Sequence, residues 1–195
     1  MKQWMADVIR QKKVTAIPVM THPGIEQNGH TVSEAVKDGR VQAEAVVALA
    51  RKYPSAAACT IMDLTVEAEA FGAEIAFSDE AVPAVVGHLL SQVEDIYSLQ
   101  VPSLSAGRIP QYLKANLLAA REINDRPLLS GCIGPFSLAG RLYDMSEMMV
   151  LIYENPEAAH QLLTKCTDFI GKYCLALKQT GANGVMMAEP AAGLL

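Results

Sequence analysis

Four short runs of the sequence are apolar along their whole length, and segments with helical spacing separate each run from the next. The runs are VTAIPVM at 14–20, AAACTIM at 56–62, LLSGCI after Pro127 and NGVMMA after Ala182. Strands that are buried on both faces of a parallel sheet carry such runs, whereas strands with one wet face alternate between apolar and polar residues. The order of strands and helices therefore predicts an α/β fold with a parallel sheet.

Two architectures fit this order, a doubly wound sheet and a (β/α)8 barrel. A barrel needs eight strands and typically about 250 residues. The chain has 195 residues and ends at AEPAAGLL, directly after the fourth run. We therefore expect residues 1–195 to be the truncated N-terminal portion of one barrel domain, with about four parallel strands and their helices.

Local signals mark several helices. Thr31 followed by Glu34 has the spacing of a capping box, which predicts a helix that begins after Thr31. Asn155 and Pro156 have the residue types of an N-cap and a first helical position, and Gly181 is placed to end the long helix that follows. The segment 21–30 is rich in Pro and Gly and is predicted to be a polar loop.

Composition excludes several classes of protein. The net charge is -5 and the basic residues form no stripe, so we expect no nucleic-acid partner. No apolar run approaches about 20 residues and the N-terminus lacks the apolar core of a signal peptide, so we expect no membrane segment. The four cysteines form no CxxC pair and lie in apolar surroundings, which favours buried thiols in a reducing compartment. We predict a soluble cytoplasmic protein.

Polar residues follow the predicted strands, where the chemistry of parallel α/β folds is located. His22 follows the first strand, Asp63 the second and Glu189 the fourth, and Glu67 lies one turn beyond Asp63. Each residue alone has a structural alternative: a helix cap for Asp63, a loop histidine for His22 and a solvated loop acid for Glu189. Together they predict a site at one rim of the barrel. The sequence contains no phosphate-binding glycine loop and no HExxH, HxH or HxC pair.

Three segments carry a family resemblance. IMDLTVEAEAFGAEIAF, LLSGCIGPFSLAGRL and GANGVMMAEPAAGLL resemble, in order and separation, segments of the uroporphyrinogen decarboxylase superfamily. The resemblance implies a (β/α)8 barrel and one of two chemistries. Uroporphyrinogen decarboxylase uses an aspartate, which Asp63 matches, to hold the pyrrole NH groups of its substrate. Corrinoid-linked methyltransferases move a methyl group from a methylated corrinoid protein to a thiol, and DLTVEAEAFG resembles their version of the segment.

Two departures from the decarboxylase pattern favour the methyltransferase branch. The decarboxylase has an arginine-rich loop after its first strand, whereas THPGIEQNG here contains no arginine. The decarboxylase also has a tyrosine after the segment that matches GPFSLAG, where this chain has Arg141, with Tyr143 nearby. The resemblance thus implies Asp63 and Glu67 as catalytic residues. It implies a substrate-binding set of His22, Glu189, Arg141 and Tyr143.

The resemblance also sets expectations for cofactors and partners. The methyltransferases hold zinc with an HxC pair and a later cysteine in the second half of the barrel. We therefore expect no metal bound by this chain alone, zinc only with a C-terminal half, and no activity from residues 1–195 alone. The expected partners are a corrinoid protein and a small thiol. The alternatives are a decarboxylase with a tetrapyrrole substrate, and a non-catalytic half-barrel that binds a partner or forms a homo-oligomer through exposed barrel edges.

Overall fold

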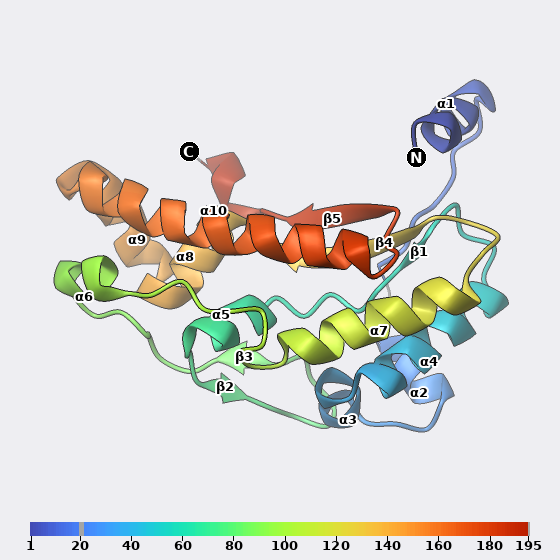
Figure 1. The fold of residues 1–195 in the computed structure, drawn as a ribbon, viewed down its shortest axis with the longest axis horizontal. Coiled ribbons are helices and arrows are strands. Elements are labelled where there is room, and N and C mark those ends of the chain that lie inside the picture. The colour runs from blue at the N-terminus through green and yellow to red at the C-terminus, as the bar shows by residue number, and fades with distance from the viewer. Residues whose placement is uncertain (20–21, 195) are drawn as a thin grey trace. The chain divides into compact units, whose positions relative to one another are not determined.

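A computed structural model describes residues 1–19 and 22–194 (Figure 1). The chain divides into two compact units, each assembled from three segments. The first unit consists of residues 1–62, 111–131 and 176–186, and the second of residues 63–110, 132–175 and 187–195. Each unit is described below by itself.

The elements of the first unit are mainly helices around the start of the sheet. They are α1 (Lys2–Arg10), α2 (His22–Gln27), α3 (Val32–Lys37), α4 (Gly39–Lys52), β1 (Ala58–Cys59) and most of α7 (Ile109–Glu122). Two strands, β4 (Leu128–Ile133) and β5 (Gly184–Ala188), begin in this unit and end in the second. The second unit adds α5 (Val66–Phe71), β2 (Ile75–Ala76), β3 (Ala84–Val85), α6 (Val93–Ser98), α8 (Pro135–Tyr143), α9 (Met145–Glu154), most of α10 (Pro156–Gln179) and the 3-10 turn η1 (Ala191–Leu194).

The main sheet has the strand order β1-β4-β5. β1 and β4 are parallel, with Ala58 opposite Leu128 and Cys59 opposite Leu129. β5 runs in the same direction as β4, because the N–H of Asn183 donates to the carbonyl of Leu128 at one end (2.9 Å) and the N–H of Gly134 donates to that of Ala188 at the other (2.8 Å). The predicted α/β class with a parallel sheet is therefore confirmed for three of the four strands.

The first predicted strand is wrong for the part that the structure describes. Residues 14–19 form no strand, and their link to the region before β1 is one hydrogen bond from the N–H of Ala56 to the carbonyl of Ala16 (3.0 Å). Pro18 cannot donate to a ladder, and Val14 is 98% exposed, so this segment lacks the burial that an inner strand needs. Met20 lies outside the described residues.

The predicted polar loop at 21–30 is wrong for residues 22–27, where α2 (His22–Gln27) lies, whereas residues 28 and 29 form a turn and Thr21 lies outside the described residues. Gly24 explains why a helix is stable there: a Cβ at this position would lie 2.7 Å from the carbonyl oxygen of Ala45, so α2 packs closely on α4. Ile25, the next residue of α2, is buried at 1% exposure. Tertiary packing therefore outweighs the loop-like composition of this segment.

The locally encoded helix ends are confirmed. The hydroxyl of Thr31 accepts from the N–H of Glu34 (3.2 Å), and the Glu34 carboxylate accepts from the N–H of Thr31 (2.9 Å), which completes the capping box. The side chain of Asn155 accepts from the N–H of Ala158 at the start of α10 (3.1 Å). Gly181 follows α10 with φ +106°, a conformation that glycine adopts without strain.

The second unit has an aromatic core under α10. Phe71 meets Phe169 edge to face at 5.2 Å between ring centroids, and Phe169 stacks on Tyr173 at 6.5 Å. Burial of such rings is the main favourable contribution to folding. Within the described residues, no helix is both long and apolar enough to cross a membrane.

Candidate functional site

Asp63 lies at the end of the apolar run that contains β1, and its carboxylate is buried. One oxygen, Oδ1, accepts from the N–H of Thr65 (2.9 Å) and from its hydroxyl (2.7 Å). The other, Oδ2, lies 2.5 Å from Nη1 of Arg108. Asp63 therefore shapes the turn before α5, as the capping alternative expects, but it is also one half of a buried ion pair.

Arg108 completes a cluster that sequence analysis did not anticipate. Its Nε donates to Oε2 of Glu69 (2.6 Å), its Nη2 donates to the hydroxyl of Thr65 (2.9 Å), and its guanidinium lies 4.9 Å from the ring centroid of Phe77. The Arg108 side chain is only 7% exposed. One guanidinium thus serves two carboxylates, Asp63 and Glu69. The run of acids in the sequence indicates that a basic residue lies nearby. It does not indicate which basic residue.

Glu67 lies between these two acids in the sequence but has a different environment. It is 1% exposed, its Oε1 accepts from the N–H of Ile133 (3.1 Å), and its Oε2 has no hydrogen-bond partner among the described residues. Burial raises the pKa of Glu67 to about 7, although backbone N–H groups and Arg141 act in the opposite direction and Asp63 adds to the rise. Glu67 can therefore gain or lose a proton near neutral pH.

Glu189, after β5, holds the beginning of α8. Its Oε2 accepts from the N–H of Phe136 (2.8 Å), and its Oε1 accepts from the N–H and the hydroxyl of Ser137 (2.8 and 2.5 Å). A negative charge at a helix N-terminus is stabilised by the unpaired N–H groups there. Gly134 makes the approach possible, because a Cβ at that position would lie 2.1 Å from the Glu189 carboxylate. Glu189 is thus a remote helix cap rather than a solvated loop acid.

A cavity of about 490 Å³ lies in the second unit at the carboxyl ends of β4 and β5. Its wall combines apolar side chains with a few polar ones, and it is made by Leu64, Val85, Gly87, His88, Ile133, Ser137, Gly140, Arg141, Asp144, Met145, Pro190 and Ala191. His88 Nδ1 and Asp144 Oδ2 are 3.9 Å apart on this wall. The cavity therefore occupies the rim where the sequence predicted a site.

The predicted site residues divide between the two units. Arg141 lines the cavity, whereas Asp63 and Glu67 lie behind its wall. Asp63 precedes the lining residue Leu64 in the sequence, and Glu67 accepts a hydrogen bond from the lining residue Ile133. Glu189 acts through α8. Tyr143, the last residue of α8, is partly exposed; burial and then nearby acids, Glu147 first, raise its pKa.

His22 belongs to the first unit, as the first residue of α2. Its Nε2 is buried and has no hydrogen-bond partner among the described residues. The role of His22 in substrate binding stays a prediction.

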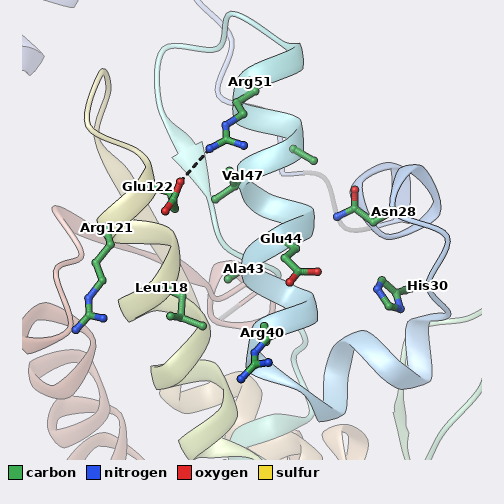
Figure 2. Close-up of a pocket in the computed structure, with 11 residues that line it drawn as sticks. Asn28, His30, Arg40, Ala43, Glu44, Val47, Arg51, Leu118, Arg121 and Glu122 are labelled. Atoms are coloured by element: carbon green, nitrogen blue, oxygen red, sulfur yellow. Dashed lines mark hydrogen bonds and ion pairs between the residues drawn. The ribbon is translucent and has the colours of Figure 1, made fainter.

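The first unit contains a larger cavity of about 710 Å³ (Figure 2). Figure 2 shows Val47 and Leu118 between charged side chains of both signs, and an ion pair between Arg51 and Glu122 with an Nη2–Oε2 distance of 2.9 Å. None of the residues predicted for the site lines this cavity. The smaller cavity is the better candidate, because it lies at the strand ends and has a titratable glutamate behind its wall.

The described residues do not fit a zinc ion. No group of three or more His, Cys, Asp or Glu side chains among them could hold a metal. Cys59, Cys132 and Cys166 are buried thiols, and Cys174 is half-buried. No step of a reaction is therefore assigned to a metal held by these residues.

Comparisons with known proteins agree with the resemblance. The family model described as "Uroporphyrinogen decarboxylase (URO-D)" matches residues 2–195. The methylcobamide:CoM methyltransferase MtbA of Methanosarcina acetivorans is 32% identical over 132 residues, which are 67% of this chain and 39% of MtbA. A uroporphyrinogen decarboxylase of Legionella pneumophila is 26% identical over 165 residues, 82% of this chain and 47% of the decarboxylase.

A solved structure described as a methyltransferase from Methanosarcina mazei superposes with a TM-score of 0.83 and 25% identity, covering 98% of this chain and 59% of that one. The chain spans less than half the length of MtbA and of the Legionella pneumophila decarboxylase.

Proposed function

The chain belongs to the uroporphyrinogen decarboxylase family, and on that premise we propose that it is the N-terminal part of a methyltransferase barrel that moves a methyl group from a methylated corrinoid protein to a thiol. The zinc that such a reaction uses would be held by residues outside 1–195. The corrinoid protein would be the partner of the assembled barrel. Residues 1–195 alone would have no turnover.

The ion pair between Asp63 and Arg108 is the observation that carries the proposal. A decarboxylase of the family needs the matching carboxylate to accept hydrogen bonds from pyrrole NH groups. Here Oδ1 already accepts two hydrogen bonds from Thr65, and Oδ2 faces a guanidinium at 2.5 Å. Releasing this carboxylate for a substrate would leave the buried guanidinium with Glu69 as its one carboxylate partner among the described residues. The cost would be part of the roughly 3–5 kcal/mol that a fully broken buried pair costs.

The charge of the cavity supports the same choice. Among the described residues that line it, Arg141 alone carries a permanent positive charge. A tetrapyrrole with eight carboxylates would need several such groups, because an unpaired carboxylate in a cavity loses hydration without compensation. The cavity volume of about 490 Å³ is instead in the range that suits a small ligand.

In this proposal the residues of this chain position the substrate and shape its site. They do not themselves carry the methyl group. Glu189 fixes the first turn of α8, and α8 presents Arg141 to the cavity. Glu67 provides a proton-holding group behind Ile133, which lines the cavity.

The test compares the two reactions directly. Purified residues 1–195 would be mixed with the separately expressed remainder of the M. acetivorans MtbA barrel, zinc, methylcobalamin and coenzyme M, and loss of methylcobalamin absorbance would be followed. We expect demethylation with both parts present and none with either alone. A parallel assay would supply uroporphyrinogen. Decarboxylated porphyrinogen without methyl transfer would replace the proposal by the decarboxylase, and neither product in any mixture would favour a non-catalytic half-barrel.

A further inference from the structure

Two cysteines of the second unit make a contact that the proposed function does not use. Cys132 lies on β4 and is buried, with 2% of its surface exposed, whereas Cys174 lies on α10 and is half-buried. The thiol of Cys132 forms a side-chain hydrogen bond with the sulfur of Cys174. Both residues belong to regular elements of one unit, so the contact links a strand to a helix.

The groups around this pair keep its buried member protonated. The N–H of Ile133, the residue after Cys132, donates to the carboxylate of Glu67 (3.1 Å). The hydrogen bond with Cys174, then burial, then the charges of Cys174 and Glu67 raise the pKa of the Cys132 thiol. Burial, and then charges of which that of Glu67 is the largest, raises the pKa of the neighbouring Tyr173 well above its usual range. Cys132 and Tyr173 therefore stay protonated near neutral pH.

Cys174 has the properties of an attacking thiol. The hydrogen bond from Cys132 stabilises the Cys174 thiolate and lowers the pKa of Cys174, although burial acts in the opposite direction. The thiolate is the form of cysteine that attacks a disulfide bond, and partial exposure gives a dissolved molecule access to the sulfur. Cys132 is placed to complete such an exchange, because its side chain already points at the sulfur of Cys174.

We propose that Cys174 and Cys132 form a thiol–disulfide exchange site, at which a small organic disulfide oxidises the pair to an intramolecular disulfide. In the first step the Cys174 thiolate attacks one sulfur of the small disulfide, and the other sulfur leaves as a thiolate. In the second step Cys132 gives its proton to solvent, and its sulfur attacks that of Cys174 and releases the second thiolate. Counted from two thiols, the pair loses two electrons and two protons, and the small disulfide becomes two thiols. The inference does not depend on the proposed function.

The other two cysteines lack this combination and provide internal controls. Cys166 lies two turns before Cys174 on α10 and is fully buried, and burial, followed by the charge of Glu189, raises its pKa to about 12. Cys59 lies on β1 in the first unit, and burial raises its pKa as well. We therefore expect one fast-reacting cysteine in the folded chain.

The first experiment counts the thiols that the exchange releases. Freshly reduced, folded residues 1–195 would react with the aromatic disulfide dithiobis(nitrobenzoate), and the coloured thiol would be followed by its absorbance. We expect two coloured thiols per chain in the fast phase, and a product that retains no reagent and has lost two hydrogen atoms by mass spectrometry. Peptide mapping should show Cys132 joined to Cys174. A native chain that releases one thiol and keeps the reagent attached would overturn the inference, as would the absence of a fast phase.

Substitutions separate the two roles. Cys132→Ser keeps a hydroxyl donor for the Cys174 thiolate but has no sulfur, so it should release one thiol at close to the native rate and keep the reagent attached. Cys174→Ser should slow the fast phase at least about tenfold. Cys166→Ala, on the same helix, is the matched control and should behave as the native chain. Fast release from Cys174→Ser, or a native disulfide that includes Cys166, would assign the exchange to other residues and overturn the inference.

The second experiment tests the hydrogen bond between the two thiols. Iodoacetamide alkylates a thiolate in a single step, so its rate reports the state of Cys174 without the exchange. Cys132→Ala removes the donor and should slow alkylation of Cys174 about two- to fivefold at pH 7, with the midpoint of the pH profile moved up toward the usual cysteine pKa of about 8.5. Cys132→Ser should stay close to the native profile. Identical profiles for Cys132→Ala and the native chain would overturn the activation of Cys174 by Cys132.

Circular dichroism of each variant would verify that it is folded, and the mass of the oxidised native chain tests the pair without any substitution. These measurements need no methyl donor and no zinc. A chain that forms the disulfide but never transfers a methyl group would refute the proposed function and leave this inference standing.

Discussion

One short segment of the second unit holds acidic side chains in two different environments. Asp63 and Glu69 share the guanidinium of Arg108, whereas Glu67 has a single backbone N–H and no described cation in contact. Residues two apart on a helix point to different sides, so Glu67 and Glu69 on α5 reach different neighbours. These carboxylates are therefore stabilised in two ways. Where a cation is within reach the carboxylate forms an ion pair, and where no cation is within reach it tends to be protonated.

The largest effect should come from removing the shared cation. Arg108→Met leaves two carboxylates without the guanidinium between them, and breaking a buried pair from one side typically costs about 3–5 kcal/mol. Urea unfolding at pH 7, followed by circular dichroism, would measure the loss. Arg10→Met is the matched control, since its side chain is 71% exposed and should change stability by under about 0.5 kcal/mol. A loss below about 1 kcal/mol for Arg108→Met would remove the distinction between the two environments.

The second prediction concerns Glu67 and pH. Its pKa is about 7 in the folded chain and 4.5 in the reference state, so the folded chain binds more protons between these values. Stability should therefore be highest below about pH 4.5 for this group, fall as the pH rises to about 7, and then level off. The total difference is about 3 kcal/mol, as an upper bound.

Glu67→Gln should lack this fall, so the variant gains stability relative to the native chain as the pH rises. The difference between the two urea-unfolding free energies, measured from pH 4 to 8, isolates Glu67 from all other acids. Glu44→Gln, at an exposed glutamate of α4, is the control and should follow the native chain. Parallel curves for Glu67→Gln and the native chain would mean that Glu67 stays ionised throughout.

The features that could be predicted from the sequence are those that depend on residues close to one another in the chain. The Thr31 and Asn155 caps, β4, β5 and the acid-rich segment after β1 are all encoded within a few positions. The partner of Asp63 was not predictable, because Arg108 is 45 positions away and nothing near it in the sequence indicates a buried arginine. The helix α2 was missed for a related reason, since its stability depends on the fit of Gly24 against α4.

The third prediction tests an acid that is held neither by a guanidinium nor by a proton. Glu189→Ala removes the carboxylate that accepts from Phe136 and Ser137, and should cost about 2 kcal/mol from the lost charge-assisted hydrogen bonds at the α8 N-terminus. Glu189→Gln keeps one acceptor oxygen and should cost less. Thermal unfolding of both variants at pH 7 would rank them. Equal losses would mean that the acceptor oxygen retained in Glu189→Gln contributes nothing without the charge.

The smallest effect is expected at the locally encoded cap of the first unit. Thr31→Ala removes the hydroxyl that accepts from the N–H of Glu34 and should cost about 1 kcal/mol. Thr31→Ser keeps the hydroxyl and serves as the control. If Thr31→Ala proved more damaging than Glu189→Ala in the same thermal-unfolding measurement, the remote cap would have no advantage over the local one.

The hydrogen bonds of Glu189 have a consequence for the order of events during synthesis. Phe136 and Ser137 precede Glu189 by 53 and 52 positions, so α8 leaves the ribosome well before the carboxylate that completes its first turn. At about 5–20 residues per second, this delay is on the order of 3–10 s. During that interval the backbone N–H groups of Phe136 and Ser137 can bind only water or a passing anion. A nascent chain stalled before residue 189 should therefore digest faster at α8 than one stalled well after it.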